Sequence, residues 1–394
     1  MSVKTIESVG ANCCGCRSCE LVCPVNAIQF CEDQEGFYYP KITDACISCG
    51  KCLKACPIAN PPETTFAPHG YAAYFAKRDQ LRKSSSGGIF AALAEHILNQ
   101  NGVVFGCAEE TPGEPRHIWI AQKEQLPMLQ GSKYVQSNMD GVYGAVKEKL
   151  DAGVPVLFSG TPCQVAGLLK CVGPQENLYT ADIICHGVPS RKLYQAYLTW
   201  LETKTGAKVQ EFLFRSKDKH DWSLTYRVLL EKDGKVKKQE RMATFSPYYR
   251  HFLKGMNYRH SCYTCPFAQK ERVSDLTLGD FWGIEGVAPE FENPDGVSAV
   301  LVNTEKGQLL WAQLQKCVVA KEVPVAQIVA NNGQLKAPTK RSPYRDSIYK
   351  ILNEQGYDAV AATCRSRKEE LIDGVKDMIP NRTRQKIKKL LKRK

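Results

Sequence analysis

The sequence lacks long apolar runs. No stretch of about eighteen consecutive apolar residues occurs in its 394 residues, so no transmembrane helix is expected. Residues 1–10 hold no apolar stretch of the length that a secretory signal peptide needs, and we therefore expect a protein of the cytoplasm. With 43% hydrophobic and 24% charged residues the chain is too apolar to be disordered, and its length predicts two or three domains.

The C-terminal segment lacks acidic residues. Between Arg382 and Lys394 there are eight basic residues, and without these eight the net charge of +12 falls to +4. Ile387, Leu390 and Leu391 would share one side of a helix in this tail. Two interpretations stay open, a peripheral contact with an anionic membrane surface and a solvated tail. Nucleic-acid binding is not expected, because the basic residues are not spread over a folded face.

Cysteine is plentiful and unevenly placed. Ten of the 18 cysteines lie between Cys13 and Cys56. Because thiols stay reduced in a cytoplasm, we interpret this group as metal ligands and not as disulfides. The pattern C-x2-C-x2-C-x3-C-P occurs twice at an offset of 33 residues, which indicates an internal duplication. The two runs are Cys13, Cys16, Cys19 and Cys23, and Cys46, Cys49, Cys52 and Cys56.

This segment resembles the bacterial-type ferredoxins that hold two [4Fe–4S] clusters. In that spacing three thiolates bind one cluster and the fourth, next to a proline, reaches the other. The resemblance implies one cluster on Cys13, Cys16, Cys19 and Cys56, and another on Cys46, Cys49, Cys52 and Cys23. Zinc is the alternative, but zinc sites use two-cysteine knuckles. Cys14 and Cys31 lie outside the pattern, and we expect them to fill a small core.

The longer part of the chain indicates an α/β domain. A serine- and glycine-rich loop, 84–88, precedes helical apolar spacing from Ile89 to Leu98. This loop favours either a phosphate-binding helix start or an ordinary N-cap. Two strand–loop–helix units follow, and each has a cysteine directly after its strand, Cys163 and Cys185. If the two strands are neighbours, both cysteines lie at one edge of the sheet.

Two more cysteines, Cys262 and Cys265, form a C-x2-C pair. Together with Cys163 and Cys185 they supply four thiolates, enough for a third [4Fe–4S] cluster. A zinc site and packing without any metal remain alternatives on spacing alone.

Five segments in order resemble the coenzyme F420 hydrogenase/dehydrogenase beta-subunit family. They are SSSGGIFAALAEHIL, LQGSKYVQSN, LFSGTPCQVAGL, IICHGVPS and CYTCPFAQKERVSDLTLGDFWG, within about Tyr71 to Leu335. The resemblance implies FAD and one [4Fe–4S] cluster, with Cys163, Cys185, Cys262 and Cys265 as the cluster ligands. It implies flavin contacts at Ser86, Gly87, Gly88, Ser132, Lys133, Tyr134, Gly160 and Thr161. Pro266-Phe267 departs from the acidic residue and aromatic that relatives often carry there, which leaves room for a different substrate side of the flavin.

Two single residues carry hypotheses of their own. His186, beside a proposed cluster ligand, would relay a proton to a hydride-accepting substrate as a catalytic residue, or would only hydrogen-bond within its loop. Lys133 would balance the negative charge of a reduced flavin or of a phosphate, or would be a solvated surface lysine.

The predicted fold class is an α+β ferredoxin-like N-terminal domain followed by a larger α/β domain. The predicted boundaries are 1–60 for the ferredoxin-type domain, 61–70 for a Pro-rich linker, 71–340 for the FAD and [4Fe–4S] domain, and 341–394 for a helical, basic tail. The predicted function is an iron–sulfur flavoprotein oxidoreductase between a one-electron carrier or partner subunit and a hydride substrate, F420 or an unidentified organic molecule. The alternatives are a non-catalytic electron-transfer subunit and a reductase of surface-polysaccharide biosynthesis.

Overall fold

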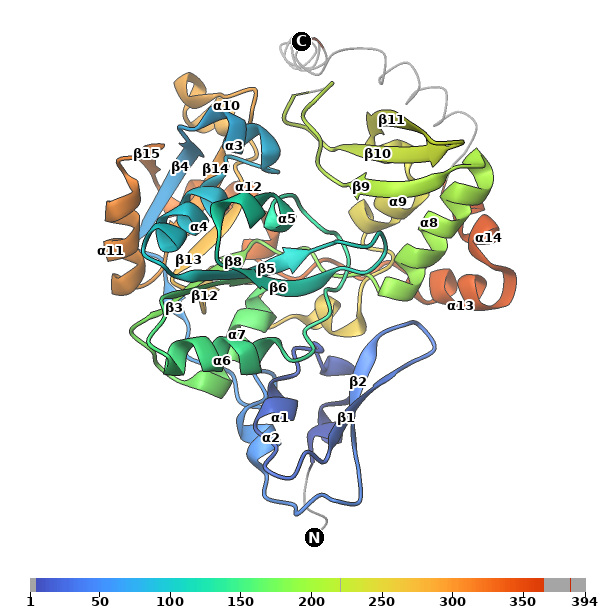
Figure 1. The fold of residues 1–394 in the computed structure, drawn as a ribbon, viewed down its shortest axis with the longest axis horizontal. Coiled ribbons are helices and arrows are strands. Elements are labelled where there is room, and N and C mark those ends of the chain that lie inside the picture. Colours follow the sequence, from blue (N-terminus) through green and yellow to red (C-terminus); the bar gives the residue numbers. More distant parts are fainter. Residues whose placement is uncertain (1–4, 220, 365–382, 384–394) are drawn as a thin grey trace.

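The N-terminal segment is small and has little apolar core. The computed structural model describes residues 5–219, 221–364 and 383. Within residues 5–60, two strands form an antiparallel pair beside short helical turns (Figure 1). Of the cysteines, Cys19 and Cys52 lie in such turns, and most of the others lie in the loops next to them. Its elements are η1 (Ile6–Asn12), α1 (Ser18–Leu21), β1 (Ile28–Glu32), β2 (Tyr38–Ile42) and α2 (Lys51–Lys54). Its buried apolar core consists of Ile6, Cys19, Ile28 and Cys56.

The predicted linker contains strand structure. Inside the interval 61–70, β3 (Thr65–Phe66) pairs antiparallel with β12 (Glu271–Arg272), and β4 (His69–Phe75) begins. The chain therefore enters the large domain by joining its sheets and not through a free spacer.

An eight-stranded mixed sheet forms the centre of the large domain. Its strand order is β15-β4-β14-β13-β8-β7-β5-β6. The four central strands β13, β8, β7 and β5 are parallel, and the strands outside them pair antiparallel. The strands not yet given are β5 (Val103–Ala108), β6 (Arg116–Ile120), β7 (Val156–Gly160), β8 (Leu178–Ile183), β13 (Leu276–Asp280), β14 (Ser298–Val302) and β15 (Val318–Val323).

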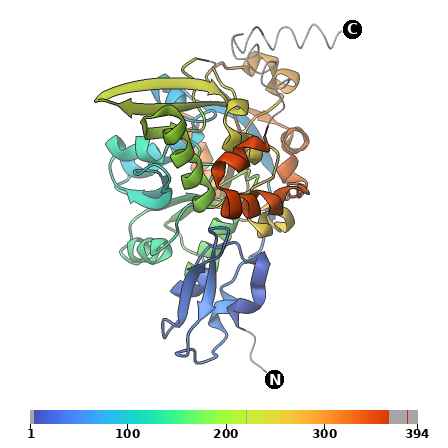
Figure 2. The same cartoon turned by 90° about the vertical axis from the view of Figure 1, so that its right-hand side faces the viewer.

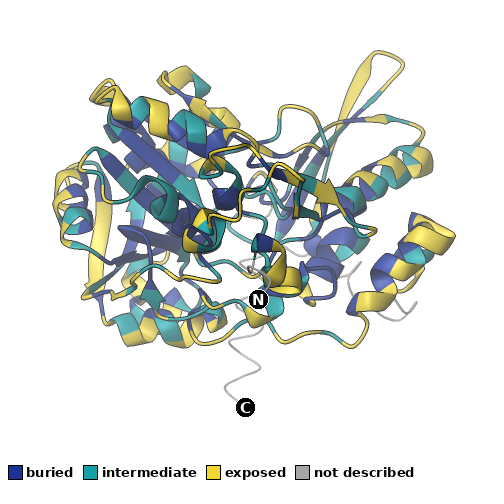
Figure 3. Cartoon of the chain, turned by 90° about the horizontal axis from the view of Figure 1, so that it is seen from below, coloured by how far each residue is buried: buried dark blue, intermediate teal, exposed yellow. Residues whose placement is uncertain are grey.

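Helices cover both faces of this sheet, and Figure 3 shows its strands largely buried while the helices keep exposed outer sides. One face packs on α4 (Ile89–Asn99) and α11 (Glu305–Leu314), the other on α6 (Val142–Asp151) and α7 (Pro162–Val172). A parallel sheet needs this double cover because its strands are apolar on both faces. The remaining elements near the sheet are α3 (Arg78–Lys83), η2 (Lys123–Gln125), α5 (Leu126–Leu129), α10 (Ile284–Val287), η5 (Pro289–Phe291), α12 (Val325–Asn331) and η6 (Gly333–Leu335).

A second lobe, rich in aromatic residues, lies beside the sheet (Figures 1 and 2). Three antiparallel strands in the order β11-β10-β9 pack with helices that flank them in the chain and with helices from the C-terminal region. The elements are α8 (Arg191–Thr205), β9 (Lys208–Leu213), β10 (Thr225–Lys232), β11 (Lys235–Met242), η3 (Ala243–Phe245), α9 (Pro247–Leu253), η4 (His260–Thr264), α13 (Arg345–Gln355) and α14 (Tyr357–Ala362).

The two predicted strand–loop–helix units form as expected. β7 and β8 are parallel neighbours, and each is followed by a helix with a capped start. Thr161 and Gln164 form a capping box at α7, and the Ser190 hydroxyl accepts a hydrogen bond from the Leu193 N–H at α8. These caps fix where each strand ends and therefore where Cys163 and the 185–189 loop begin.

The predicted fold class is confirmed. A small α+β segment precedes a larger α/β domain, and α13 and α14 make the described part of the C-terminal region helical. The predicted basic tail lies outside the described residues apart from residue 383. In the part of the chain that the structure describes, no helix is both long enough and apolar enough to span a membrane.

Candidate functional site

A cavity of about 300 Å³ opens at the carboxyl ends of the parallel strands. This edge is where open α/β sheets bind their ligands, and the volume lies within the range of small-molecule sites. The cavity wall includes seven of the eight residues predicted to contact flavin, together with the predicted catalytic histidine and two of the predicted cluster cysteines. These residues are Ser86, Gly88, Ser132, Lys133, Tyr134, Gly160, Thr161, His186, Cys163 and Cys185.

The serine- and glycine-rich loop is fastened to the sheet behind the cavity. Gly87 lies behind the wall, and a Cβ there would stand 2.3 Å from the Ala73 carbonyl oxygen. Its N–H donates to the Ser298 hydroxyl, at 2.9 Å. Gly88 occupies the N-cap position of α4, and no serine side chain of the loop caps that helix. The loop therefore presents backbone to the cavity.

Lys217 also holds this loop. This residue is 4% exposed, and its ammonium group donates to the carbonyl oxygens of Leu81 and Ser86, at 2.9 and 2.7 Å, and to that of Asp295. Burial lowers the pKa of Lys217 to about 7. No sequence motif marks this lysine, because its partners are carbonyl groups of distant segments.

Lys133 and Tyr134 lie on the wall of the cavity. The Lys133 ammonium donates to the carbonyl oxygens of Gln130 and Met128, at 2.8 and 3.3 Å, and burial lowers its pKa. Tyr134 stacks on Phe252, with ring centroids 4.4 Å apart. Lys133 is thus held by the loop and is not a freely solvated lysine.

The cavity is also bordered by a charged pair, Arg215 and Asp280, which the sequence analysis did not identify. Arg215, 4% exposed, forms an ion pair with Asp280 at 2.6 Å, and the Trp222 indole N–H donates to the same carboxylate at 2.9 Å. Trp222 stacks on Trp282 with centroids 5.2 Å apart. Asp280 and Trp282 belong to the segment LTLGDFWG, which could have flagged them, whereas Arg215 stands in no motif.

His117 forms another wall that sequence reasoning missed. Its imidazole lies between the Ser137 hydroxyl at 2.9 Å and the Ser159 carbonyl oxygen at 3.0 Å, and it stacks on Phe158. Burial lowers the pKa of His117 to about 4, so the ring is neutral at physiological pH.

His186 follows Cys185 and lines the cavity. Its ring lies 6.4 Å from that of Phe252, and its carbonyl oxygen accepts a hydrogen bond from the Thr339 hydroxyl at 2.8 Å. Partial desolvation of its ring lowers the pKa of His186, with the Asp280 carboxylate acting in the opposite direction. A neutral imidazole on this wall can accept a proton.

The four cysteines predicted for the large domain lie next to one another. Burial raises the pKa of the Cys185 thiol well above its usual range, and the neighbouring thiols of Cys262, Cys163 and Cys265 raise it further. Burial also raises the pKa of Cys265 to about 11. Cys262 lies in η4 and Cys265 directly after it, whereas Cys163 lies in the first turn of α7. Three separate segments thus bring four thiols to one place.

The N-terminal cysteines form two groups. Burial raises the pKa of Cys19, and the neighbouring thiols of Cys16, Cys13, Cys56 and Cys52 raise it further. The other group lines a separate small hollow made of Cys23, Cys46, Cys49 and Cys52. Cys52 thus lies near both groups, and the crossed ligand pattern stays a prediction.

The two remaining N-terminal cysteines do not share one role. Cys31 is exposed, so the expectation that it fills a core is wrong. Cys14 lines the large cavity. Its thiol contacts those of Cys16 and Cys163, and these contacts hold its pKa well above the usual range. It therefore stands at the junction between the N-terminal segment and the large domain.

The N-terminal segment docks directly on α7. A Cβ at Gly167 would stand 2.9 Å from the Cys16 sulfur, so only glycine lets the helix approach this closely. Nearby, the Gln136 amide donates to the Cys14 carbonyl oxygen at 3.2 Å, and the Cys171 thiol contacts the Ser18 carbonyl oxygen.

Comparison with known proteins finds a likeness for each part. Residues 155–327 match the family described as the C terminus of the coenzyme F420 hydrogenase/dehydrogenase beta subunit. The ferredoxin 7Fe of Hydrogenibacillus schlegelii is 40% identical over 67 residues, which cover 17% of this chain and 81% of that ferredoxin. The ferredoxin-type protein NapF of Haemophilus influenzae is 43% identical over 44 residues, 11% of this chain and 25% of NapF.

The N-terminal segment belongs to the ferredoxins. Joined to it is a domain whose residues 155–327 are similar to the coenzyme F420 hydrogenase/dehydrogenase beta-subunit family. We call residues 5–60 the ferredoxin segment from here on.

Two further likenesses are more distant. An uncharacterized protein of Methanocaldococcus jannaschii is 23% identical over 197 residues, 42% of this chain and 54% of that protein. The chain thus spans about half the length of this relative and a quarter of NapF. The F420-reducing [NiFe] hydrogenase complex of Methanosarcina barkeri contains a chain that is 18% identical, with a TM-score of 0.43, over 76% of this chain and 91% of that one.

Proposed function

We propose that this protein is an iron–sulfur flavoprotein oxidoreductase. The ferredoxin segment would exchange single electrons with a redox carrier protein or a partner subunit. The large domain would exchange a hydride with a small molecule, coenzyme F420 or another organic substrate. The observation that carries the proposal is the single cavity that the predicted flavin residues share with Cys163 and Cys185.

The cavity has the chemistry that FAD requires. The Oε1 atom of Gln130 is buried on its wall and has no hydrogen-bond partner among the described residues, so an acceptor is left for a ring N–H. Backbone at the starts of α4 and α7, with the Lys133 ammonium, suits a diphosphate. FAD, when bound, supplies both hydride and single-electron chemistry. The chain's own residues would orient the ring and exclude water from it.

The cysteine groups have the donor set of [4Fe–4S] clusters. Four thiolates hold such a cluster, and the proposed ligands are Cys13, Cys16, Cys19 and Cys56 for one, Cys23, Cys46, Cys49 and Cys52 for the second, and Cys163, Cys185, Cys262 and Cys265 for the third. The third would lie beside the cavity and, through Cys14 and Cys16, next to the first.

The third site is tested by iron content. A Cys262→Ser variant is expected to lose about four iron atoms per chain and to keep the ferredoxin-type signals in electron paramagnetic resonance. Cys317→Ser is the matched control, because Cys317 lies after α11 and not among the proposed ligands. Equal iron in Cys262→Ser and in the wild type contradicts the third site.

His186 is the proposed proton-transfer residue. His186 is exposed at the cavity, and partial desolvation of its ring lowers its pKa. The imidazole is therefore neutral near pH 7 and can accept or return a proton at the substrate side of the cavity. A His186→Gln variant is expected to bind flavin normally and to turn over substrate at least about a hundredfold more slowly.

Flavin content decides between the proposal and its main alternative. Anaerobically purified protein supplemented with FAD is expected to release about one FAD per chain on denaturation. Lys133→Gln should weaken FAD binding by about tenfold, because a charged hydrogen-bond donor to the diphosphate is lost, whereas the exposed Lys123→Gln should not. Intact clusters without flavin would contradict the proposal and leave a non-catalytic electron-transfer subunit.

A further inference from the structure

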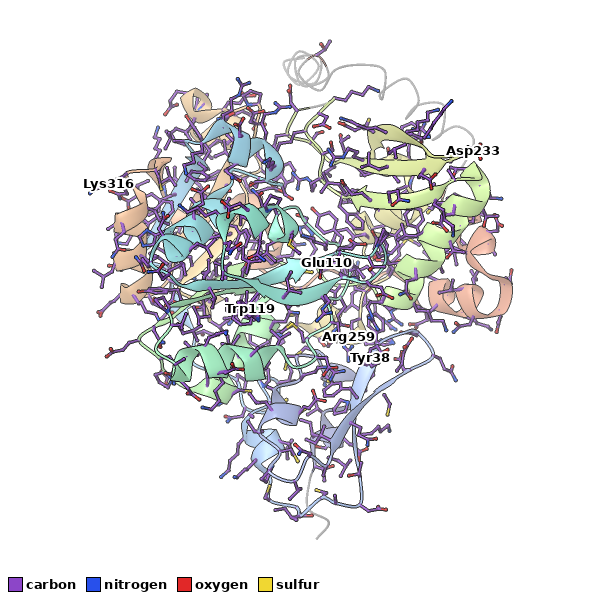
Figure 4. All side chains as sticks on the ribbon, viewed as in Figure 1. Tyr38, Glu110, Trp119, Asp233, Arg259 and Lys316 are labelled. Atoms are coloured by element: carbon purple, nitrogen blue, oxygen red, sulfur yellow. The ribbon has the colours of Figure 1, made fainter. Side chains whose placement is uncertain are left out.

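Arg259 lies between the ferredoxin segment and the cysteines of the large domain. Figure 4 labels it beside Tyr38, where the ferredoxin segment meets the large domain. Its side chain is 0% exposed. The guanidinium donates to the carbonyl oxygens of Cys13 and Tyr38, at 2.6 and 2.9 Å, and to the Gln136 side-chain oxygen at 3.1 Å. Its ring neighbours are Phe37 and Tyr39.

The backbone of Arg259 is hydrogen-bonded to the segments that carry Cys185 and Cys262. Its N–H donates to the Val188 carbonyl oxygen at 2.8 Å, in the loop that follows Cys185. Its carbonyl oxygen accepts from the Cys262 N–H at 3.0 Å. One residue therefore joins the Cys13 loop, the Cys185 loop and the Cys262 turn.

The charge of Arg259 has no acidic partner in the described part of the chain. All three of its side-chain acceptors are neutral, and no carboxylate forms an ion pair with it there. The buried Arg345 of the same junction differs, because it forms a two-point ion pair with Glu35, at 2.5 Å. A buried charge without a counter-charge is strongly unfavourable, so a negative group is expected close to Arg259.

The side chain and the backbone of Arg259 each contact one of the two cysteine loops. Its guanidinium donates to the Cys13 carbonyl oxygen at 2.6 Å, and its own carbonyl oxygen accepts from the Cys262 N–H at 3.0 Å. The proposed clusters on these two loops are therefore the candidate counter-charges. A [4Fe–4S] cluster held by four thiolates is itself an anion, and it gains one more negative charge on reduction.

We propose that Arg259 is a positioning residue that supplies one shared positive charge to two iron–sulfur clusters, that of Cys13 and that of Cys262. This rests on the proposed function, because the second cluster is part of it. The guanidinium holds the two cysteine loops together. Its positive charge would also favour the reduced state on both sides and so raise both cluster potentials.

The test is a redox titration of anaerobically reconstituted full-length protein, followed by electron paramagnetic resonance. In Arg259→Gln the charge is lost, and the ratio of reduced to oxidised cluster at a fixed potential should fall by about tenfold, or about 59 mV for a one-electron couple. Both cluster signals should shift to lower potentials. Arg259→Lys keeps the charge and should retain most of the wild-type potentials.

Arg345→Gln is the matched control. It removes a guanidinium that is buried equally well in the same junction but is already paired with Glu35. Its cluster potentials should stay close to those of the wild type. Equal shifts in Arg345→Gln and Arg259→Gln would overturn the proposal, because they would show that loosening of the junction is sufficient.

Iron content separates this proposal from the proposed function. A wild-type protein without iron at Cys262 contradicts the third cluster and is detected before any Arg259 variant is made. If Arg259→Gln keeps its full iron content and its cluster potentials do not change, the proposal that Arg259 supplies a shared charge is overturned and the proposed function is not affected. If Arg259→Gln does not retain iron, Arg259→Lys decides: wild-type potentials support the charge, and lowered potentials overturn it.

Discussion

The ferredoxin segment and the large domain gather cysteines in different ways. In the ferredoxin segment the sulfur atoms come from two short repeats, and its buried apolar cluster is small, made of Ile6, Cys19, Ile28 and Cys56. In the large domain the cysteines follow β7, follow β8 and lie in and after η4, and they stand on a double-covered sheet. We therefore expect the ferredoxin segment to depend for its stability on bound iron–sulfur clusters and on its contact with the large domain. The large domain has an extensive apolar core that is expected to be stable without either.

Removal of iron should give the largest difference between the two regions. Anaerobic chelation is expected to unfold the ferredoxin segment and to leave the large domain folded, because metal binding supplies much of the folding free energy of so small a core. Hydrogen exchange should show loss of protection in β1 and β2 and unchanged protection in β7 and β8. Protected β1 and β2 amides in iron-free protein would contradict this comparison.

Truncation of the sheet core should destabilise the large domain by a smaller but measurable amount. Leu157 lies on β7 and is fully buried, so Leu157→Ala should lower the free energy of unfolding by about 2–5 kcal/mol. Leu309→Ala, at an exposed position of α11, should change it by less than about 0.5 kcal/mol. Chemical denaturation followed by circular dichroism measures both, and equal effects of the two variants would be inconsistent with the assigned core.

The junction between the two regions is tested at Gly167. A methyl group there would press on the Cys16 sulfur and on the Tyr143 hydroxyl, each 2.9 Å from the added carbon. Gly167→Ala should therefore cost about 1–3 kcal/mol of stability and increase hydrogen exchange in α1. The adjacent exposed face offers a control, Lys147→Ala on α6, which should leave α1 unchanged. Unaltered exchange in Gly167→Ala would mean that α7 does not hold the ferredoxin segment.

The smallest effect concerns acid sensitivity of the large domain. The folded pKa of His117 is about 4, below its unfolded value of 6.5, so its contribution is fully favourable above pH 6.5 and is lost as the pH falls toward 4. At pH 6 the loss is about 1 kcal/mol. His117→Gln should show a shallower decline of stability between pH 7 and pH 5 than the wild type, and parallel curves would refute the assignment.

The sequence predicted the two kinds of site unequally well. The ferredoxin ligands could be grouped from spacing, because three ligands of a cluster lie within one turn of chain. Cys163 and Cys185 could be placed at one sheet edge, because β7 and β8 are consecutive and parallel. Arg215 and His117 could not be found, since each reaches the cavity from a strand or loop that has no motif.

Cys14 and Cys31 show the same limit. Both looked like spare cysteines in one segment, and one is exposed while the other contacts Cys16 and Cys163. Their difference depends on where the ferredoxin segment meets α7, and no local pattern reports a contact between residues so far apart in the chain.

The sequence by itself determined the ferredoxin segment, the order of the strand–loop–helix units and the cysteines that could bind metal, because these depend on local spacing and periodicity. Only the tertiary structure decided that seven of the eight residues predicted to contact flavin line one cavity. It also decided that a buried arginine without a carboxylate partner in the described chain joins two cysteine groups. The physical reason is that burial and charge pairing are properties of neighbours in space. Arg259 and Arg345 are the same residue type at one junction, and only their surroundings distinguish them.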